Sequence, residues 1–199
     1  MFDKSVPYFD VIMHRSAGSP IPEYKLPEGY KFVFFQMGDE KDWGDIQESV
    51  GGYDTDVEAM LKFQSKYTQM PDEIVRRCIF VESPEGERVG TVMIWWEYSG
   101  LRRDPWLNYV AVKPTHQGKG ICQAMLCHML HMAIDIEGDR DMYLHTQTWS
   151  HQAIRIYEKF GFQITKEPNL YKYANDQYVQ AQTVLRDIYS KYPEKLRKK

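Results

Sequence analysis

The residues whose types and spacing most clearly suggest chemistry form the loop Gln117-Gly118-Lys119-Gly120. This loop stands between an apolar run and a long amphipathic pattern, which predicts a strand, a turn and a helix. Glycine allows unusual backbone angles and a close approach, so the N–H groups of such a loop can point at an anion. The first hypothesis is therefore a binding site for a phosphate-bearing cofactor.

Two common phosphate motifs do not fit this loop. A nucleotide P-loop needs Ser or Thr after its lysine, and here Lys119 is followed by Gly120. The dinucleotide motif G-x-G-x-x-G fails at its third glycine, where Gln123 stands. What remains is a pyrophosphate on the helix N-terminus, which favours an anion by about 0.3–1 kcal/mol. A tight turn that only packs the helix on the strand is the open alternative.

Hydrophobic periodicity and turn residues predict the elements that position this loop. Strands are predicted over residues 30–35, 77–82, 88–98, 106–112, 142–146 and 162–165, the second and third forming a hairpin. Helices are predicted over residues 39–50, 56–67, 121–136, 151–160 and 176–191, with Asp39, Asp56 and Ser150 as N-caps. The prolines of residues 1–29 predict a loop-rich N-terminal arm laid over the core.

One domain over residues 1–199 accounts for this pattern, because a chain of 199 residues with 43% apolar side chains can bury one substantial core. The order of elements predicts a mixed α/β (α+β) fold with a largely antiparallel sheet. The net charge of −3, from 25 basic and 28 acidic residues, argues against a nucleic-acid partner. The basic residues from Lys191 to Lys199 are predicted to form a solvated tail.

Three cysteines, Cys78, Cys122 and Cys127, sit in apolar patterns without metal-ligand spacing. They predict reduced, buried thiols and no metal site. No run of 18 apolar residues occurs, and the N-terminus has neither the basic nor the apolar region of a signal peptide. We therefore expect a cytoplasmic protein without a membrane partner.

A second segment strengthens the phosphate hypothesis. It contains Tyr157-Glu158-Lys159-Phe160-Gly161-Phe162, preceded by Ala153. Together with the loop, this segment resembles the GNAT family of acetyl-CoA-dependent N-acetyltransferases. Gln117, Gly120 and Cys122 correspond to the first family motif, Gln/Arg-x-x-Gly-x-Gly/Ala. Ala153 and residues 157–162 correspond to the second, Asn-x-x-Ala followed by Tyr-Glu-Lys-x-Gly-Phe. The match covers about residues 105–165. Cys122 departs from the usual Gly or Ala, and Ser150 stands where Asn is frequent.

The resemblance implies a V-shaped opening between two parallel strands, residues 106–112 and 142–146, in which acetyl-CoA lies. It implies that the first strand pairs with the pantetheine arm, that the loop holds the pyrophosphate, and that a strand N–H near Ala111 or Val112 meets the acetyl oxygen. The cofactor residues it assigns are Val110, Ala111, Val112, Gln117, Gly118, Lys119, Gly120, Ile121, Cys122 and Ser150.

Transfer of an acetyl group to an amine also needs an acid and a base. Tyr157 matches the family position beside the cofactor sulfur, where a phenol can donate a proton; packing as an ordinary aromatic residue is its alternative role. The positions at which family members often carry a base hold Trp106 and Asn108, which do not titrate usefully. The alternatives for the base are Glu97, Asp104, His145 or water.

The predicted function is transfer of an acetyl group from acetyl-CoA to a primary amine of a small molecule or peptide, by direct attack in a ternary complex. The alternative is a non-catalytic acyl-CoA-binding or regulatory protein of the same fold. The last helix is predicted to pack on the sheet or on a second subunit, and it favours a homodimer. Aromatic residues near the predicted acceptor cleft would hold a cationic amine or pack as core residues: Trp95, Trp96, Tyr98, Trp106 and Trp149.

Overall fold

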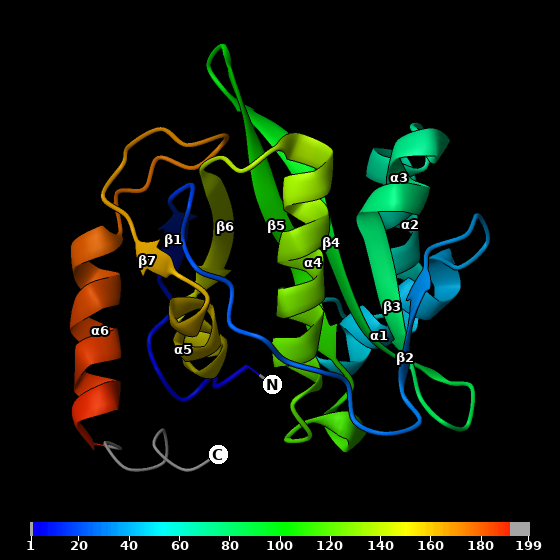
Figure 1. Cartoon of the computed structure of the whole chain (residues 1–199). Helices are drawn as coiled ribbons and strands as arrows, with labels where there is room; N and C mark the ends of the chain where they lie inside the picture. Colours follow the sequence, from blue (N-terminus) through cyan, green and yellow to red (C-terminus); the bar gives the residue numbers. More distant parts are fainter. Residues whose placement is uncertain (1, 192–199) are drawn as a thin grey trace.

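A seven-stranded sheet forms the centre of the computed structural model, which describes residues 2–191 (Figure 1). The strands are β1 (Asp10–Arg15), β2 (Lys31–Phe34), β3 (Cys78–Glu82), β4 (Arg88–Ser99), β5 (Arg102–Val112), β6 (Met142–Gln147) and β7 (Phe162–Ile164). Their order across the sheet is β2-β3-β4-β5-β6-β1-β7. Neighbouring strands are antiparallel except β5 and β6, which are parallel. The predicted mixed, mostly antiparallel α/β fold is confirmed.

Helices cover both faces of this sheet. They are α1 (Glu40–Ser49), α2 (Asp56–Tyr67), α3 (Pro71–Arg77), α4 (Ile121–Glu137), α5 (His151–Lys159) and α6 (Tyr178–Lys191). Helices α4, α5 and α6 share one apolar core with the sheet, while α1, α2 and α3 share another with β3, β4 and β5 (Figure 1). Two 3₁₀ turns, Pro114–His116 and Thr148–Ser150, lead into α4 and α5.

The predicted helices begin close to their expected residues, but their caps differ. Thr55, not Asp56, is the N-cap of α2, and its hydroxyl accepts the N–H of Glu58 at 3.1 Å. Asp39 and Ser150 occupy N-cap positions without a capping hydrogen bond from their side chains. The sequence therefore located the starts of these helices, but it did not identify which side-chain oxygen accepts a hydrogen bond from an N–H group of the first turn.

Strand β1 corrects the prediction that residues 1–29 form a loop-rich arm. Asp10–Arg15 pairs with β6 on one side and β7 on the other, so it lies within the sheet. The Arg15 side chain is buried, and its Nε donates to the Phe160 carbonyl at 3.0 Å. Residues 16–30 do run without regular structure, and they cross in front of α4 on their way to β2 (Figure 1). The prolines correctly indicated that this crossing segment is irregular, but the same pattern did not indicate the short strand that precedes it.

Helix α6 packs on its own chain. Ala181 and Leu185 are buried in the core shared with the sheet, and Tyr178 and Ile188 are half-buried. Intramolecular packing therefore accounts for much of the apolar face, and the homodimer stays a prediction. The basic residues after Lys191 lie outside the described residues. Within residues 2–191, no helix combines the length and apolar character needed to cross a membrane.

Candidate active site

The parallel strands β5 and β6 separate to form a V-shaped opening. They pair only at Trp106 with Tyr143 and at Leu107 with Leu144, although β5 continues to Val112 and β6 to Gln147. On its other side β5 stays paired with β4 as far as Val112. The backbone edge of β5 beyond Leu107 is therefore free of β6 and faces the opening.

A bulge in β5 sits at the mouth of this opening. Thr91 of β4 pairs with Ala111, whereas Met93 pairs with Asn108, so Val92 lies opposite two residues of β5. Tyr109, one of those two, has a φ of +54°, in the left-handed region that a residue with a side chain seldom adopts. A bulge of this kind changes the direction of the backbone groups in it and after it, which here include those of Val110 to Val112.

The phosphate-loop residues form an open cradle at the start of α4. Gly118 and Gly120 have φ values of +77° and +83°, and a Cβ at either position would have no heavy atom within 4 Å. Within residues 2–191, the N–H groups of Gly118, Lys119 and Gly120 make no backbone hydrogen bond outside regular elements, and the first intrahelical bond of α4 is donated by Ala124. Unpaired donors around open space fit a pyrophosphate.

The cradle and the V open into one cavity of about 1440 Å³. The ten residues predicted to contact the cofactor all line it, and so does Tyr157: Val110, Ala111, Val112, Gln117, Gly118, Lys119, Gly120, Ile121, Cys122 and Ser150. Their roles stay predictions, since lining a cavity does not identify its ligand. Two polar side chains are engaged by the protein, because Gln117 Nε2 donates to the Val112 carbonyl at 2.8 Å and Ser150 Oγ accepts from Gln147 at 3.1 Å.

Tyr157 lies on the buried side of α5 and lines the cavity. It is 7% exposed, and burial raises the pKa of its phenol well above the usual range, with a further contribution from the nearby Cys122 thiol. Burial likewise raises the pKa of Cys122 to about 12. At neutral pH both groups are therefore protonated, so Tyr157 can act as a proton donor and Cys122 is not a thiolate nucleophile.

His145 of β6 is paired with a carboxylate that no sequence motif indicated, that of Asp10. Its Nε2 lies 2.9 Å from Asp10 Oδ1 of β1, and its ring stacks on Tyr173 at a centroid distance of 4.0 Å. Burial lowers the pKa of His145, with a smaller contribution from the charge of Lys172, while the hydrogen bond that the ring donates to Asp10 acts in the opposite direction. The imidazole lines the cavity in its neutral form at pH 7, where it can accept a proton.

The other two candidate bases are held by basic side chains. Glu97 lines the cavity, but its Oε1 is 2.5 Å from Lys66 Nζ of α2. Asp104 is buried against Arg102, with 2.8 Å between Oδ1 and Nε, and is not among the residues that line the cavity. Of the three candidates, His145 is the one that lines the cavity without an ion pair to a basic side chain.

Aromatic side chains surround the cavity, although several differ from those expected. Trp106 and Trp149 line it, whereas Trp95, Trp96 and Tyr98 do not. Other aromatic residues, which no sequence pattern indicated, also line the cavity, and two of them come from the N-terminal segment and contact Trp149: Phe2, Tyr8, Tyr53, Tyr67, Tyr109, Tyr171 and Tyr173. Because they come from five separate segments, no local pattern could have grouped them.

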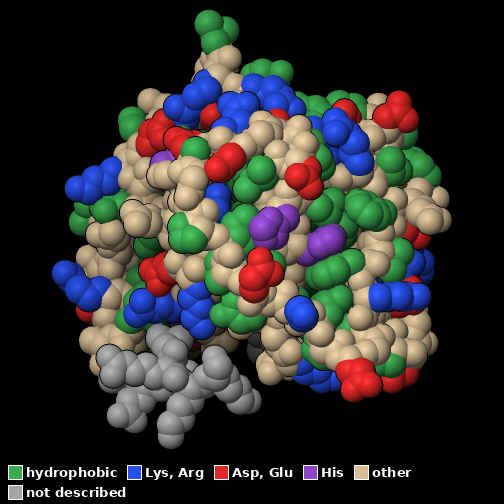
Figure 2. All heavy atoms as spheres, viewed as in Figure 1, with side chains coloured by type: hydrophobic (Ala, Val, Ile, Leu, Met, Phe, Trp, Pro, Cys, Tyr) green, Lys and Arg blue, Asp and Glu red, His purple; other side chains and the backbone are tan. Residues whose placement is uncertain are grey.

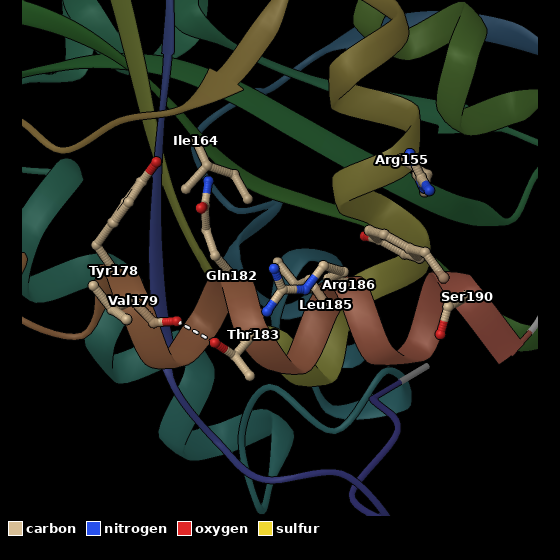
Figure 3. A pocket seen from close by; sticks show the side chains of 10 residues that line it. Arg155, Ile164, Tyr178, Val179, Gln182, Thr183, Leu185, Arg186 and Ser190 are labelled. Atoms are coloured by element: carbon tan, nitrogen blue, oxygen red, sulfur yellow. Dashed lines mark hydrogen bonds between the residues drawn. The ribbon is translucent and has the colours of Figure 1, made fainter.

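A second hollow, of about 640 Å³, lies between α6, α5 and β7 (Figure 3). Two of its polar side chains contact neighbouring groups of the protein: Thr183 Oγ1 donates to the Val179 carbonyl at 2.9 Å, and the Arg155 guanidinium lies 3.6 Å from the Tyr189 ring centre. Among the described residues that line it, none was predicted to bind the cofactor or take part in the reaction. The candidate chemistry therefore belongs to the larger cavity.

The central part of the chain matches the model of a known protein family. The family model for the acetyltransferase (GNAT) family matches residues 43–162, which is more than half of the chain and includes the loop, β5, β6 and α5. No curated protein matches the chain significantly. The motif-based resemblance is thus confirmed over a region broader than the two motifs.

Solved structures show the same fold. A GCN5-related N-acetyltransferase from Sphaerobacter thermophilus has a TM-score of 0.63 and 23% identity over 80% of this chain and 49% of its own. A tandem GNAT protein from the clavulanic acid biosynthesis pathway has a TM-score of 0.57 and 13% identity over 82% and 52%. A predicted acetyltransferase with acetyl-CoA from Clostridium acetobutylicum has a TM-score of 0.54 and 18% identity over 69% and 92%. The chain spans about half the length of the Sphaerobacter thermophilus protein and of the tandem GNAT protein.

Proposed function

The chain belongs to the acetyltransferase (GNAT) family, and we propose that it transfers an acetyl group from acetyl-CoA to a primary amine by direct attack in a ternary complex. The observation that carries this proposal is the meeting of three features in one cavity. They are the glycine cradle at α4, the protonated Tyr157 and His145, whose ring is hydrogen-bonded to Asp10 outside the cavity lining. A phosphate site alone would not need the last two.

The cofactor end of the cavity would hold acetyl-CoA mainly through backbone groups. The N–H groups from Gly118 to Cys122 suit the pyrophosphate, with Lys119 adding a positive charge at the rim. The free edge of β5 suits the amides of the pantetheine arm. When bound there, acetyl-CoA supplies an activated acetyl thioester.

Val112 is the better of the two candidates for the donor to the acetyl oxygen. Lys113 N donates to the Val89 carbonyl of β4 at 2.8 Å, so by strand alternation the backbone groups of Val112 point away from β4 and into the opening. The Val112 carbonyl already accepts from Gln117 on that side. Its N–H is therefore directed where negative charge would develop.

Proton transfer would be divided between His145 and Tyr157. The amine must lose a proton to attack, and neutral His145 can accept one at the ring nitrogen that does not face Asp10. Asp10 fixes the ring and favours the imidazolium that forms. Tyr157 would donate its proton to the departing thiolate. Each such assistance is typically worth about 10²–10⁴-fold in rate.

The proposal is tested with the full chain in two measurements. Acetyl-CoA should raise the thermal midpoint, since a ligand at a hundredfold excess over Kd stabilises the native state by about 2.7 kcal/mol. Release of free thiol from acetyl-CoA is then followed over polyamines, amino sugars, amino acids and peptides. An unchanged midpoint at millimolar acetyl-CoA would contradict the cofactor; a shift without thiol release from any class would favour the acyl-CoA-binding alternative.

A further inference from the structure

A Cys, a His and a Glu meet on the outer face of α4, away from the cavity. Cys127 and His131 are four residues apart on the helix and therefore share one face. Glu23 reaches them from the segment that crosses α4, with Oε2 3.9 Å from Cys127 Sγ and Oε1 3.6 Å from His131 Nε2. Figure 2 shows histidine and acidic side chains together in the middle of this face.

We propose that Glu23, Cys127 and His131 bind a divalent transition-metal ion, with Zn²⁺ as the best match. One donor atom from each residue lies within 4.8 Å of the other two. In a tetrahedral zinc site with ordinary bond lengths, the ligand atoms are about 3.3–3.5 Å apart. The separations from Glu23 to Cys127 and to His131, 3.9 and 3.6 Å, exceed these by only a few tenths of an ångström, and the donor atoms of Cys127 and His131 lie within 4.8 Å of each other. Side-chain rotations would have to close the remaining gaps.

The donor set selects the kind of metal. A thiolate and an imidazole are poor ligands for Mg²⁺ or Ca²⁺, which prefer oxygen, whereas thiolate, imidazole and carboxylate together suit zinc. Cys127 would lose its thiol proton to solvent as the Zn–S bond forms. Three protein ligands leave a fourth position for water.

The crossing segment is held in place without the metal. Ile21 and Leu26, on either side of Glu23, pack against the main core, and the Tyr24 ring lies 5.7 Å from the Phe160 ring. The Glu23 backbone is thus positioned by apolar contacts, and only its exposed carboxylate has to adjust. Preorganisation of this kind lowers the entropic cost of binding.

The metal would fasten the crossing segment to α4 and take no part in acetyl transfer. None of the three ligands lines the cavity, so the inference does not depend on the proposed function. Tyr24, the neighbour of Glu23, does line the cavity. By fastening the crossing segment to α4, the metal would therefore hold Tyr24, a residue of the cavity wall, in place from outside the cavity.

The test uses untagged, metal-free full chain titrated with Co²⁺ and then with Zn²⁺. We expect one equivalent of cobalt to bind with a thiolate-to-cobalt charge-transfer band, which zinc then removes. Cys127→Ser should abolish the band, and Glu23→Gln and His131→Ala should each weaken binding at least about tenfold. Glu23 is largely exposed, so its variant should fold normally.

His128→Ala is the matched control, because His128 neighbours Cys127 but stacks on Phe32 at 4.2 Å and is not among the three donors. It should retain the cobalt band and the affinity of the unchanged protein. The proposal is wrong if the unchanged protein gives no band at stoichiometric cobalt. It is equally wrong if Glu23→Gln and His131→Ala bind as tightly as the unchanged protein, or if His128→Ala loses affinity as His131→Ala does.

Discussion

The two ends of the large cavity are built in different ways. At the cofactor end, one contiguous stretch from Gln117 to Cys122 lines the cavity, and its useful groups are backbone N–H donors. At the other end, His145 of β6, Asp10 of β1 and Tyr173 of the loop before α6 meet through their side chains. Backbone donors survive most substitutions, whereas each side chain can be removed singly. The first end should therefore control binding and the second turnover.

The largest expected effect comes from Gly120→Val at the cofactor end. Valine would have to adopt a φ of +83° and would fill the open cradle, so the thermal shift caused by acetyl-CoA should disappear. Gly138→Val is the matched control, because Gly138, at the other end of α4, has a φ of +80° and equally open surroundings outside the cavity. Differential scanning fluorimetry compares the two. If acetyl-CoA raises the thermal midpoint of Gly120→Val as much as that of the unchanged protein, the cradle does not bind the cofactor.

His145→Gln should lower kcat by about 10²–10⁴-fold while leaving acetyl-CoA affinity nearly unchanged, because the imidazole is proposed to act only on the amine proton. His14→Gln is the control: His14 is also paired with an aspartate, Asp141, at 3.0 Å, but does not line the cavity. Steady-state kinetics with a known acceptor measure both variants. If His145→Gln and the unchanged protein have equal kcat values, His145 is not the base, and water or Glu97 would accept the proton instead.

Tyr157→Phe should lower kcat by about 10²-fold, the lower end of the range for acid–base assistance, since the ring packing is kept and only the proton donor is lost. Acetyl-CoA affinity should scarcely change. Tyr178→Phe on α6 removes a hydroxyl outside the cavity and should leave kcat unaltered. If Tyr157→Phe turns over at the normal rate when chemistry is rate-limiting, Tyr157 is a packing residue.

Asp10→Asn should change the pH dependence more than the maximal rate. The Asp10 carboxylate favours the imidazolium form, so its removal should lower the pKa of His145 further. A neutral base then persists to lower pH, and the acid limb of the kcat/KM profile should move downward in pH. The profile is measured from the acid side with one acceptor. If the acid limb stays at the same pH, or moves to higher pH, Asp10 does not control the pKa of the group that titrates.

The smallest effect is expected for Lys119→Met. Lys119 is exposed, and its Nζ lies 2.9 Å from the Tyr30 hydroxyl, so its charge is well solvated. Acetyl-CoA affinity should fall less than about fivefold, and less still at high salt. Isothermal titration at two salt concentrations measures this. A loss as large as that of Gly120→Val would mean that side-chain charge, not the backbone cradle, dominates the cofactor end.

The sequence predicted the helix and strand order well where periodicity was long, as in α4 and the β3–β4 hairpin. It missed β1 because Asp10–Arg15 is short, has polar ends and follows a proline-containing stretch. It also missed α3, a seven-residue helix that begins at Pro71. Short elements are decided by the partners they pack against, and those partners are distant in the sequence.

The sequence by itself determined the loop from Gln117 to Gly120, since glycine angles, a strand end and a helix start are local properties of consecutive residues. Only the tertiary structure decided which titratable group faces the cavity and what orients it. Asp10 and His145 are 135 positions apart, and Glu23 and Cys127 are 104 apart. Pairs at such separations meet because the sheet places β1 beside β6 and the crossing segment lies over α4. That placement depends on the packing of the whole core, which no short stretch of residues encodes.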